Sequence, residues 1–425
     1  MFAVVVVLIV GVVVMSGESF WLPVLGVVLA ILGADLIISR RGVCPVVARE
    51  VPAHLAVNVV AEVVLKISLE DGSPVVLQVY DELPERCELA DGGMPRKLKI
   101  KPNERVEVRY GFIPLRRGDA TFGQVVMLVL SPLGLWETRR RLMSPQTVRV
   151  YPDFSIITSY LGLLSDQQTV RLGLRLTPRR GEGLEFHQLR EYRTGDSVRQ
   201  IDWKASARRQ SLISREYQEE RDQRVLFLID SGRRMRARDG RLSHFDYALN
   251  AMLLLAYIAL RQGDSVALKV FGHDRKWIPP QRGVASVNLL LNESYDLHTG
   301  TEAADYLSAA EEVMTQQRKR SLVILLTNLR EEDDDLAPAL ALLRKRHVVL
   351  LANLREQILD ENAEHMPQNF DAALRVAGTH AYLAARRQHQ ASCQALAHLL
   401  IDCTPEELPV SVVNAYWQVK RSGAL

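Results

Sequence analysis

The chain opens with its most apolar stretch. Residues 1–16 contain no charged side chain, and a second apolar run extends from Phe20 to Ile38. In a helix with a rise of about 1.5 Å per residue, the first run would reach only about 24 Å against a hydrocarbon core of about 30 Å, whereas the second is long enough. The pattern predicts a transmembrane helical hairpin over residues 1–40, with a tilted or re-entrant first segment as an alternative.

The charges around this hairpin predict its orientation. Arg40 and Arg41 directly follow the second run. Because basic residues favour the cytoplasmic side, we expect the hairpin to lie in the inner (plasma) membrane with the body of the protein in the cytoplasm. A cleavable signal peptide is the competing interpretation, but the run lacks a basic region before it and an Ala-x-Ala site after it.

The next part of the chain, residues 43–150, alternates between short β-like runs and turn signals. Asp71-Gly72, Asp91-Gly92-Gly93 and Arg117-Gly118-Asp119 are residue types that accept turn dihedral angles. Strands at this spacing predict an antiparallel, all-β sandwich. The arginines at 116, 117 and 139–141 fit a solvated rim, or a contact with an anionic membrane as the alternative.

The pattern changes to α/β after a connector at residues 151–222. Val225–Asp230 is a continuous apolar run of the length of a buried strand, and helix-like and strand-like segments alternate after it. This alternation predicts a Rossmann-like α/β domain with a mostly parallel sheet over residues 223–425. The segments are helix-like at 244–262, 301–318, 335–346 and 373–400, and strand-like at 265–271, 322–329 and 347–354.

Composition adds little to this picture. The chain has 425 residues, of which 48% are hydrophobic and 24% charged, and a formal net charge of +3. That charge is too small to indicate a polyanionic partner. The four cysteines show no metal-ligand spacing, so reduced structural thiols are expected.

The densest polar segment runs from Gly181 to Asp222, where charged and aromatic residues alternate. Three interpretations fit it: a structural ion-pair network, a surface that docks a partner, and a nucleic-acid site formed by the arginines of 171–224. The interspersed carboxylates weaken the third interpretation, because they dilute the positive field that phosphate binding requires.

The run LREYRTGDSVRQIDWKASARRQSLISREY, followed by an apolar strand that ends in Asp230, resembles the signature of the family called domain of unknown function 58. The segments LRRGDATFG and SPLGLWETRR, and a closing Thr-Pro turn before a short helix, are also similar to that family. The resemblance implies a membrane-anchored protein with a von Willebrand factor A-like domain.

In a von Willebrand A domain, Asp-x-Ser-x-Ser, a Thr and an Asp on three loops hold a divalent cation, and oxygen ligands suit Mg²⁺ or Ca²⁺. The resemblance implies a degenerate version here, with Asp230, Thr301 and Asn328 as the metal positions. Arg234 replaces a pattern serine, and we hypothesise that it substitutes for the ion and meets a partner's carboxylate. Thr301 has the N-cap of a helix as its alternative role.

The resemblance implies a non-catalytic adaptor or scaffold that binds a MoxR-type AAA+ ATPase or its client in the assembly or activation of other proteins. No catalytic residue and no cofactor are expected. The alternatives are a metal-dependent hydrolase that uses Asp230 and the carboxylates of 331–335, and the nucleic-acid binder. The residues expected to bind a partner are Arg190, Tyr192, Asp196, Arg199, Asp202, Trp203, Arg208, Ser231 and Arg234.

Overall fold

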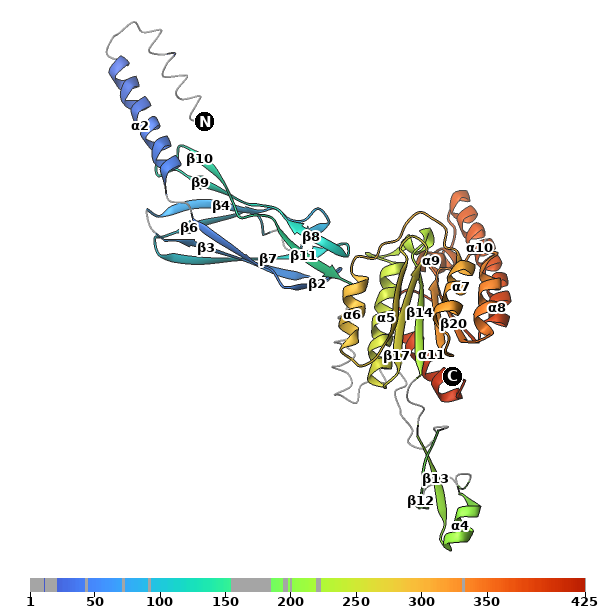
Figure 1. The fold of residues 1–425 in the computed structure, drawn as a ribbon. Helices are drawn as coiled ribbons and strands as arrows, with labels where there is room; N and C mark the ends of the chain where they lie inside the picture. Colours follow the sequence, from blue (N-terminus) through green and yellow to red (C-terminus); the bar gives the residue numbers. More distant parts are fainter. Residues whose placement is uncertain are drawn as a thin grey trace. The chain divides into compact units, whose positions relative to one another are not determined.

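The computed structural model describes residues 11, 21–42, 45–70, 73–90, 93–153, 185–193, 198, 201–218, 223–330 and 333–424. The chain divides into two compact units, residues 1–151 and residues 152–425 (Figure 1). The first holds sheets arranged like a β-sandwich and the second an α/β domain. The predicted order of an all-β part followed by an α/β part with a mostly parallel sheet is therefore confirmed.

The first unit is built from two four-stranded sheets and one three-stranded sheet. Its strands alternate between buried and exposed side chains, so each sheet has a face that packs into the core. In the strand from Ala61 to Leu69, for example, Val63, Leu65 and Ile67 are fully buried. One sheet has the order β1 (Val46–Glu50), β3 (Ala61–Leu69), β7 (Glu104–Pro114), β5 (Cys87–Leu89). The second has the order β10 (Glu137–Leu142), β9 (Val125–Leu130), β4 (Val75–Asp81), β6 (Arg96–Ile100), and the third the order β2 (His54–Ala56), β11 (Gln146–Tyr151), β8 (Gly118–Phe122).

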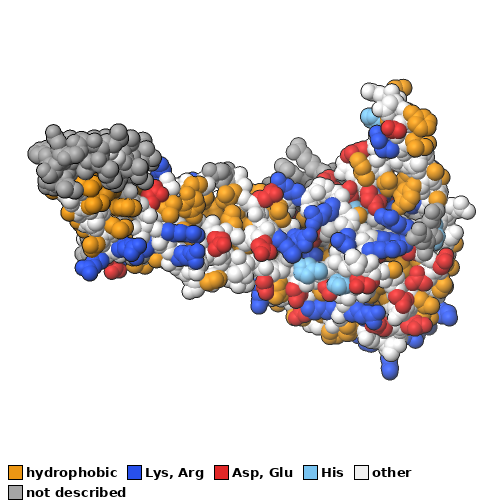
Figure 2. All heavy atoms as spheres, turned by 90° about the horizontal axis from the view of Figure 1, so that it is seen from above, with side chains coloured by type: hydrophobic (Ala, Val, Ile, Leu, Met, Phe, Trp, Pro, Cys, Tyr) orange, Lys and Arg blue, Asp and Glu red, His pale blue; other side chains and the backbone are white. Residues whose placement is uncertain are grey.

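A helix of 21 residues, α2 (Trp21–Arg41), precedes these sheets. It corresponds to the second apolar run, and apart from Gly11 the first run lies outside the described residues. Within the part of the chain that the structure describes, no helix is long and apolar enough to cross a membrane. At this end of the first unit, hydrophobic side chains are bordered by Lys and Arg side chains (Figure 2).

A six-stranded sheet forms the centre of the second unit, in the order β18 (Lys276–Gln281), β17 (Ser265–Phe271), β14 (Arg224–Asp230), β19 (Leu322–Thr327), β20 (Val348–Leu354), β21 (Leu399–Cys403). All neighbouring pairs are parallel except β17 with β18. One face packs against α5 (His244–Arg261), α6 (Ser286–Ser294) and α11 (Leu408–Ser422). The other face packs against α7 (Tyr306–Gln316), α8 (Leu336–Arg344) and α10 (Phe370–Leu396) (Figure 1).

Some predicted boundaries differ from the observed ones. The helix expected from residue 301 begins at Tyr306, because Asp305 accepts a hydrogen bond from the Ser308 amide at 2.8 Å and so caps the first turn. The N-cap role considered for Thr301 is therefore wrong. Shorter elements also occur: η3 (Arg233–Arg236), β15 (Arg238–Asp239), β16 (Leu242–Ser243) and α9 (Gln357–Glu364).

The described residues of the polar segment, 185–193, 198 and 201–218, form a small arm that precedes β14 in the chain. It consists of the antiparallel pair β12 (Glu185–Glu191) and β13 (Ile213–Gln218), with the short helix α4 (Trp203–Arg209) between them. Asp202 caps this helix by accepting hydrogen bonds from the amides of Lys204 and Ala205, both at 3.0 Å. The Ser206 hydroxyl accepts a hydrogen bond from the Ile213 amide at 2.9 Å, which ties the helix to the pair of strands.

Candidate functional site

The strand order sets the place where a ligand site is expected in the second unit. β14 lies between β17, the next strand of the sheet along the chain, and β19, the third parallel strand. The chain therefore changes direction across the sheet at β14, and ligands of open α/β sheets bind at such a switch point, beyond the carboxyl ends of the strands. Asp230 ends β14 and Thr327 ends β19, so both residues lie at this position.

Asp230 is buried and its carboxylate is surrounded by donors from its own chain. Oδ1 accepts a hydrogen bond from the Gly232 amide at 2.7 Å. Oδ2 accepts one from the Thr327 hydroxyl at 2.8 Å and one from the Tyr306 hydroxyl at 3.2 Å. Burial raises the pKa of Asp230 above its usual value, and these three hydrogen bonds oppose that rise without cancelling it.

Gly232 occupies the position where the metal-binding pattern has its first serine. A Cβ atom there would lie 3.0 Å from Asp230 Oδ1 and 3.0 Å from the Ala304 amide nitrogen. The loop after β14 is held against the loop before α7 by the Gly300 amide, which donates to the Ser231 carbonyl at 3.1 Å, and the Arg233 amide, which donates to the Glu302 carbonyl at 2.9 Å. A serine ligand at position 232 would therefore have to push these two loops apart.

Arg234, at the position of the second pattern serine, forms an ion pair with Asp333 in the loop after β19. Both side chains are largely buried. Burial raises the pKa of Asp333 above its usual value, although the Arg234 guanidinium acts to lower it. The carboxylate that Arg234 was expected to find on a partner is thus present in the same chain.

Asn328 is fully buried and its side chain is engaged by other residues of the chain. Its amide nitrogen donates to Glu356 Oε1 at 2.8 Å, and its amide oxygen accepts from Arg386 at 3.3 Å. Arg386 comes from α10 and also donates to the Leu329 and Leu354 carbonyls, at 2.8 and 2.7 Å. A guanidinium therefore links the carboxyl ends of β19 and β20, next to the switch point.

These contacts do not fit a divalent cation. The oxygens of Asp230 are taken by Gly232, Thr327 and Tyr306, and Asn328 is taken by Glu356 and Arg386. Thr301 has an exposed side chain. Among the residues that the structure describes, no group of three or more His, Cys, Asp or Glu side chains is arranged to hold a metal ion.

Of the carboxylates of 331–335 proposed for a hydrolase, Asp333 and Asp335 are engaged within the chain, and Asp334 is exposed. Asp333 pairs with Arg234, and Asp335 accepts a hydrogen bond from the Tyr306 amide at 2.7 Å. Glu331 and Glu332 lie outside the described residues.

The residues expected to bind a partner fall into two groups at the two ends of β14. Ser231 and Arg234 follow its carboxyl end. Ser231 is buried, and its hydroxyl donates to the Phe271 carbonyl at 2.8 Å and accepts from the Asp274 amide at 3.0 Å. This hydroxyl holds two loops together and is not available to a partner.

The other group lies on the arm, which leads into the amino end of β14. Arg190 and Tyr192 are half-buried, Asp202 is the helix cap, and Arg208 is exposed. Trp203, the first residue of α4, has 64% of its surface exposed. Asp196 and Arg199 lie outside the described residues, as do the arginines of 171–180 that were considered for nucleic-acid binding.

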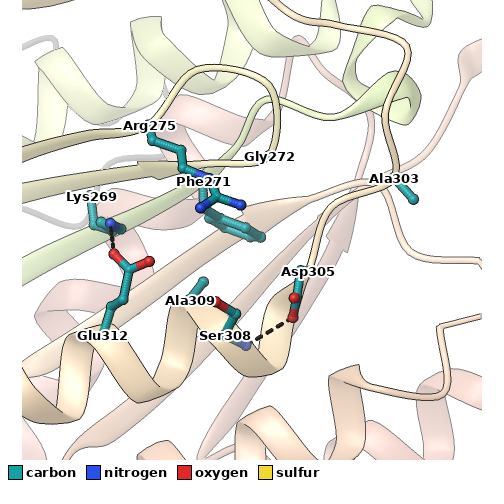
Figure 3. Close-up of a pocket in the computed structure, with 9 residues that line it drawn as sticks. All are labelled: Lys269, Phe271, Gly272, Arg275, Ala303, Asp305, Ser308, Ala309 and Glu312. Carbon is teal, nitrogen blue, oxygen red and sulfur yellow. Dashed lines mark hydrogen bonds and ion pairs between the residues drawn. The ribbon is translucent and has the colours of Figure 1, made fainter.

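A small hollow lies between the end of β17 and the start of α7 (Figure 3). Lys269 and Glu312 form an ion pair at one side of it, and Asp305 caps α7 at the other. Its acidic residues are therefore already engaged within the chain. The lining residues are Lys269, Phe271, Gly272, Arg275, Ala303, Asp305, Ser308, Ala309 and Glu312.

The sequence did not point to two of the residues that build this site. Tyr306 and Arg386 contact Asp230 and Asn328 from segments distant in the sequence. Asp333, which contacts Arg234, lies in the acidic run 331–335 that was considered for a hydrolase, but its pairing with Arg234 was not expected. Thr327 could have been predicted from the sequence, because it ends an apolar strand and directly precedes Asn328.

A family model for the protein of unknown function DUF58 matches residues 188–398, which run from within β12 to the residue before β21. This chain carries a DUF58 family domain. The DUF58 domain therefore contains the arm from residue 188 onward, the switch point and α10, whereas the β-sandwich-like unit, β21 and α11 lie outside it.

The chain is also a distant homologue of the uncharacterized protein YeaD of Bacillus subtilis (strain 168). The two are 23% identical over 241 residues, which is 55% of this chain and 57% of that relative. The match thus spans little more than half the length of the relative.

Similarity to solved structures is low. Proximal thread matrix protein 1 from the mussel byssus is 13% identical, with 46% of each chain covered and a TM-score of 0.29. Trypsin-activated alpha-2-macroglobulin from Escherichia coli is 9% identical, with 89% of this chain and 29% of that chain covered and a TM-score of 0.22. The fold described above therefore rests on the strands and helices of this chain alone.

Proposed function

We propose that this chain is a membrane-anchored, non-catalytic adaptor whose second unit, a von Willebrand A-like head, binds a protein partner through the arm. The observation that carries the proposal is the exposure of Trp203 on a helix that is capped and tied to two strands. Tryptophan is enriched among the residues that contribute most to the affinity of protein interfaces.

The surroundings of Trp203 support this assignment. Leu189, Val198 and Leu212, also on the arm, have 45%, 63% and 49% of their surfaces exposed. Arg208 and Arg209 are exposed in the last turn of α4. Large apolar side chains gathered on a small module and accompanied by arginines fit the composition of a partner-binding surface.

The switch point is less suited to a partner's carboxylate, because its own groups already satisfy one another. Asp230 receives three hydrogen bonds and Arg234 is paired with Asp333. A partner that displaced either group would have to compensate for the loss of these buried contacts. We therefore place the docking surface on the arm.

The class of partner comes from the resemblance of the signature run to the DUF58 family. That resemblance implies a MoxR-type AAA+ ATPase or its client, in the assembly or activation of other proteins. The anchor is proposed from the apolar runs 1–16 and 20–38 and the two arginines after them, which fit a hairpin in the inner membrane with the head in the cytoplasm.

The test is affinity capture with the full-length protein solubilised in detergent, with and without ATP, followed by mass spectrometry of the retained proteins. Wild type is compared with Trp203→Ala and with Phe370→Ala, which removes an aromatic residue that is 81% exposed at the start of α10. We expect wild type and Phe370→Ala to retain an AAA+ ATPase and Trp203→Ala to lose it. Recovery of no such ATPase under either condition would refute the proposed partner. Equal recovery by Trp203→Ala and wild type would refute the arm as the docking surface.

A further inference from the structure

The turn between β9 and β10, residues 131–136, contacts one face of α2. The Leu133 amide donates to Asp35 Oδ1 at 3.2 Å, and the Trp136 indole donates to the Leu32 carbonyl at 3.2 Å. Leu32, Asp35 and Ser39 are buried and recur at the spacing of one helix face. The turn thus covers the carboxyl-terminal part of α2 and shields the carboxylate of Asp35.

β10 continues along α2 toward its last residues. The Ser39 and Thr138 hydroxyls are 2.6 Å apart, and Arg140 donates to the Arg40 carbonyl at 2.6 Å. From Trp136 to Arg140 the strand advances about 13 Å, and from Leu32 to Arg40 the helix advances about 12 Å. The two elements therefore run side by side, as Figure 1 shows for α2 and β10.

This arrangement limits how much of α2 lies free of the sheets. The part before Leu32, residues 21–31, reaches about 16 Å, little more than half of a hydrocarbon core of about 30 Å. If α2 enters a bilayer beyond this free part, the lipid has to reach the level at which the turn covers the helix. The turn itself then meets lipid.

The side chains of the turn suit that position. Leu133 is 60% exposed and Trp136 is 38% exposed, and Trp is enriched at the boundary between headgroups and hydrocarbon. The turn has a fixed shape, because the Ser131 hydroxyl accepts hydrogen bonds from the amides of Leu135 and Trp136, both at 3.0 Å. An exposed apolar tip on a well-defined turn can enter lipid without first becoming ordered.

Most of the exposed charged side chains along the same edge are basic. Arg40, Arg41, Arg139 and Arg141 are all exposed, and Arg140 reaches the end of α2. Glu137 is the single carboxylate of β10 and is also exposed, so it belongs in the headgroup layer rather than in hydrocarbon. Figure 2 shows Lys and Arg side chains bordering the hydrophobic ones at this end of the unit.

We infer that the β9–β10 turn is a second contact with the bilayer that holds α2. Leu133 and Trp136 enter the boundary between headgroups and hydrocarbon, and Arg40, Arg41, Arg139 and Arg141 bind anionic headgroups. The inference rests on the proposed membrane insertion of α2. It gives the first unit a role, which is to fix the β-sandwich-like sheets against the membrane surface.

The test uses the full-length protein in nanodiscs of phosphatidylcholine and phosphatidylglycerol whose acyl chains carry bromine, a quencher of tryptophan fluorescence. Trp21→Phe removes the reporter in α2, and Trp136→Phe removes the reporter in the turn. We expect Trp136→Phe to remove part of the emission that the brominated lipid quenches, because this inference puts the Trp136 indole at the boundary of the lipid. Trp21→Phe should also remove part of it if α2 is inserted as proposed. Trp417→Phe is the control and should leave the quenched emission unchanged, because the Trp417 side chain packs against the core of the second unit.

The outcomes separate this inference from the proposed anchor. If Trp21→Phe lowers the quenched emission and Trp136→Phe does not, α2 is inserted and the contact of the turn is refuted. If neither substitution lowers it, the anchor and the turn contact both fail.

A second variant tests the charges without altering Trp136. We expect the double substitution Arg139→Glu and Arg141→Glu to lower quenching of Trp136 in nanodiscs with phosphatidylglycerol to the level found in phosphatidylcholine alone. Unchanged quenching would refute the role of the anionic headgroups.

Discussion

Arg386 offers a sharp test of how the carboxyl edge of the central sheet is held together. Its guanidinium comes from α10 and reaches three strands: it donates to the Leu329 and Leu354 carbonyls and to Asp402 Oδ1, the last at 3.1 Å. It also donates to the amide oxygen of Asn328. Arg386→Met keeps an unbranched side chain that reaches about as far as the arginine Nε, and it removes every donor.

The expected loss follows from these contacts. Removal of one partner from a buried, hydrogen-bonded charge costs about 3–5 kcal/mol. Asp402 keeps Arg355 at 3.1 Å and Asn353 at 2.7 Å, so its carboxylate is not left alone. We therefore expect the lower end, about 3 kcal/mol of unfolding free energy, which corresponds to a fall in Tm of roughly 6–12 °C for a domain of this size.

Thermal unfolding of the full-length protein in detergent measures the shift, and amide hydrogen exchange locates it. Exchange should accelerate at the carboxyl ends of β19, β20 and β21. Arg387→Met is the matched control, because Arg387 is exposed and bonds to the Leu383 carbonyl within its own helix. If Arg386→Met unfolds within about 1 °C of that control, the guanidinium does not hold this edge.

Three further predictions concern single groups. Burial raises the folded-state pKa of Asp230, so its contribution to stability is fully present below the unfolded-state pKa of about 4 and is lost as pH rises through the folded value. Asp230→Asn should flatten this loss in thermal unfolding measured from about pH 4 upward. Burial lowers the pKa of His347 to about 4, so stability should fall as pH drops from 6.5 toward 4, by up to about 3 kcal/mol, and His347→Leu should abolish that fall. Asp202→Ala removes the cap of α4 and should cost about 1 kcal/mol locally, seen as faster hydrogen exchange in Trp203–Arg209, and unchanged exchange there would contradict the role of the cap.

Strands with one buried face could be predicted from the sequence, whereas strands that depend on a neighbour could not. β3 and β7 alternate between buried and exposed residues, and the alternation is visible in the chain. β10 reads ETRRRL and has no buried residue, so only its backbone pairing with β9 makes it a strand. The pairing of β12 with β13 was also missed, because a helix and many other residues separate the two strands.

The candidate site likewise has one part that the sequence predicts and another part that it does not. Asp230 was found because it ends an apolar strand, and that position is local information. Its partners Thr327 and Tyr306 are 97 and 76 residues away, and Arg386 is 58 residues from Asn328. Only the folded sheet brings these groups together, so the sequence indicated a degenerate metal site where the structure has a network of hydrogen bonds within the chain.

In the proposed function, the arm binds the partner and the switch point does not. The most direct measurement is the equilibrium affinity of the captured ATPase for the full-length protein, for wild type, Trp203→Ala and Asp230→Asn. We expect Trp203→Ala to weaken binding by roughly 30-fold or more, as for a central interface residue, and Asp230→Asn to leave the affinity unchanged. Loss of binding in Asp230→Asn together with wild-type affinity in Trp203→Ala would contradict the proposed function.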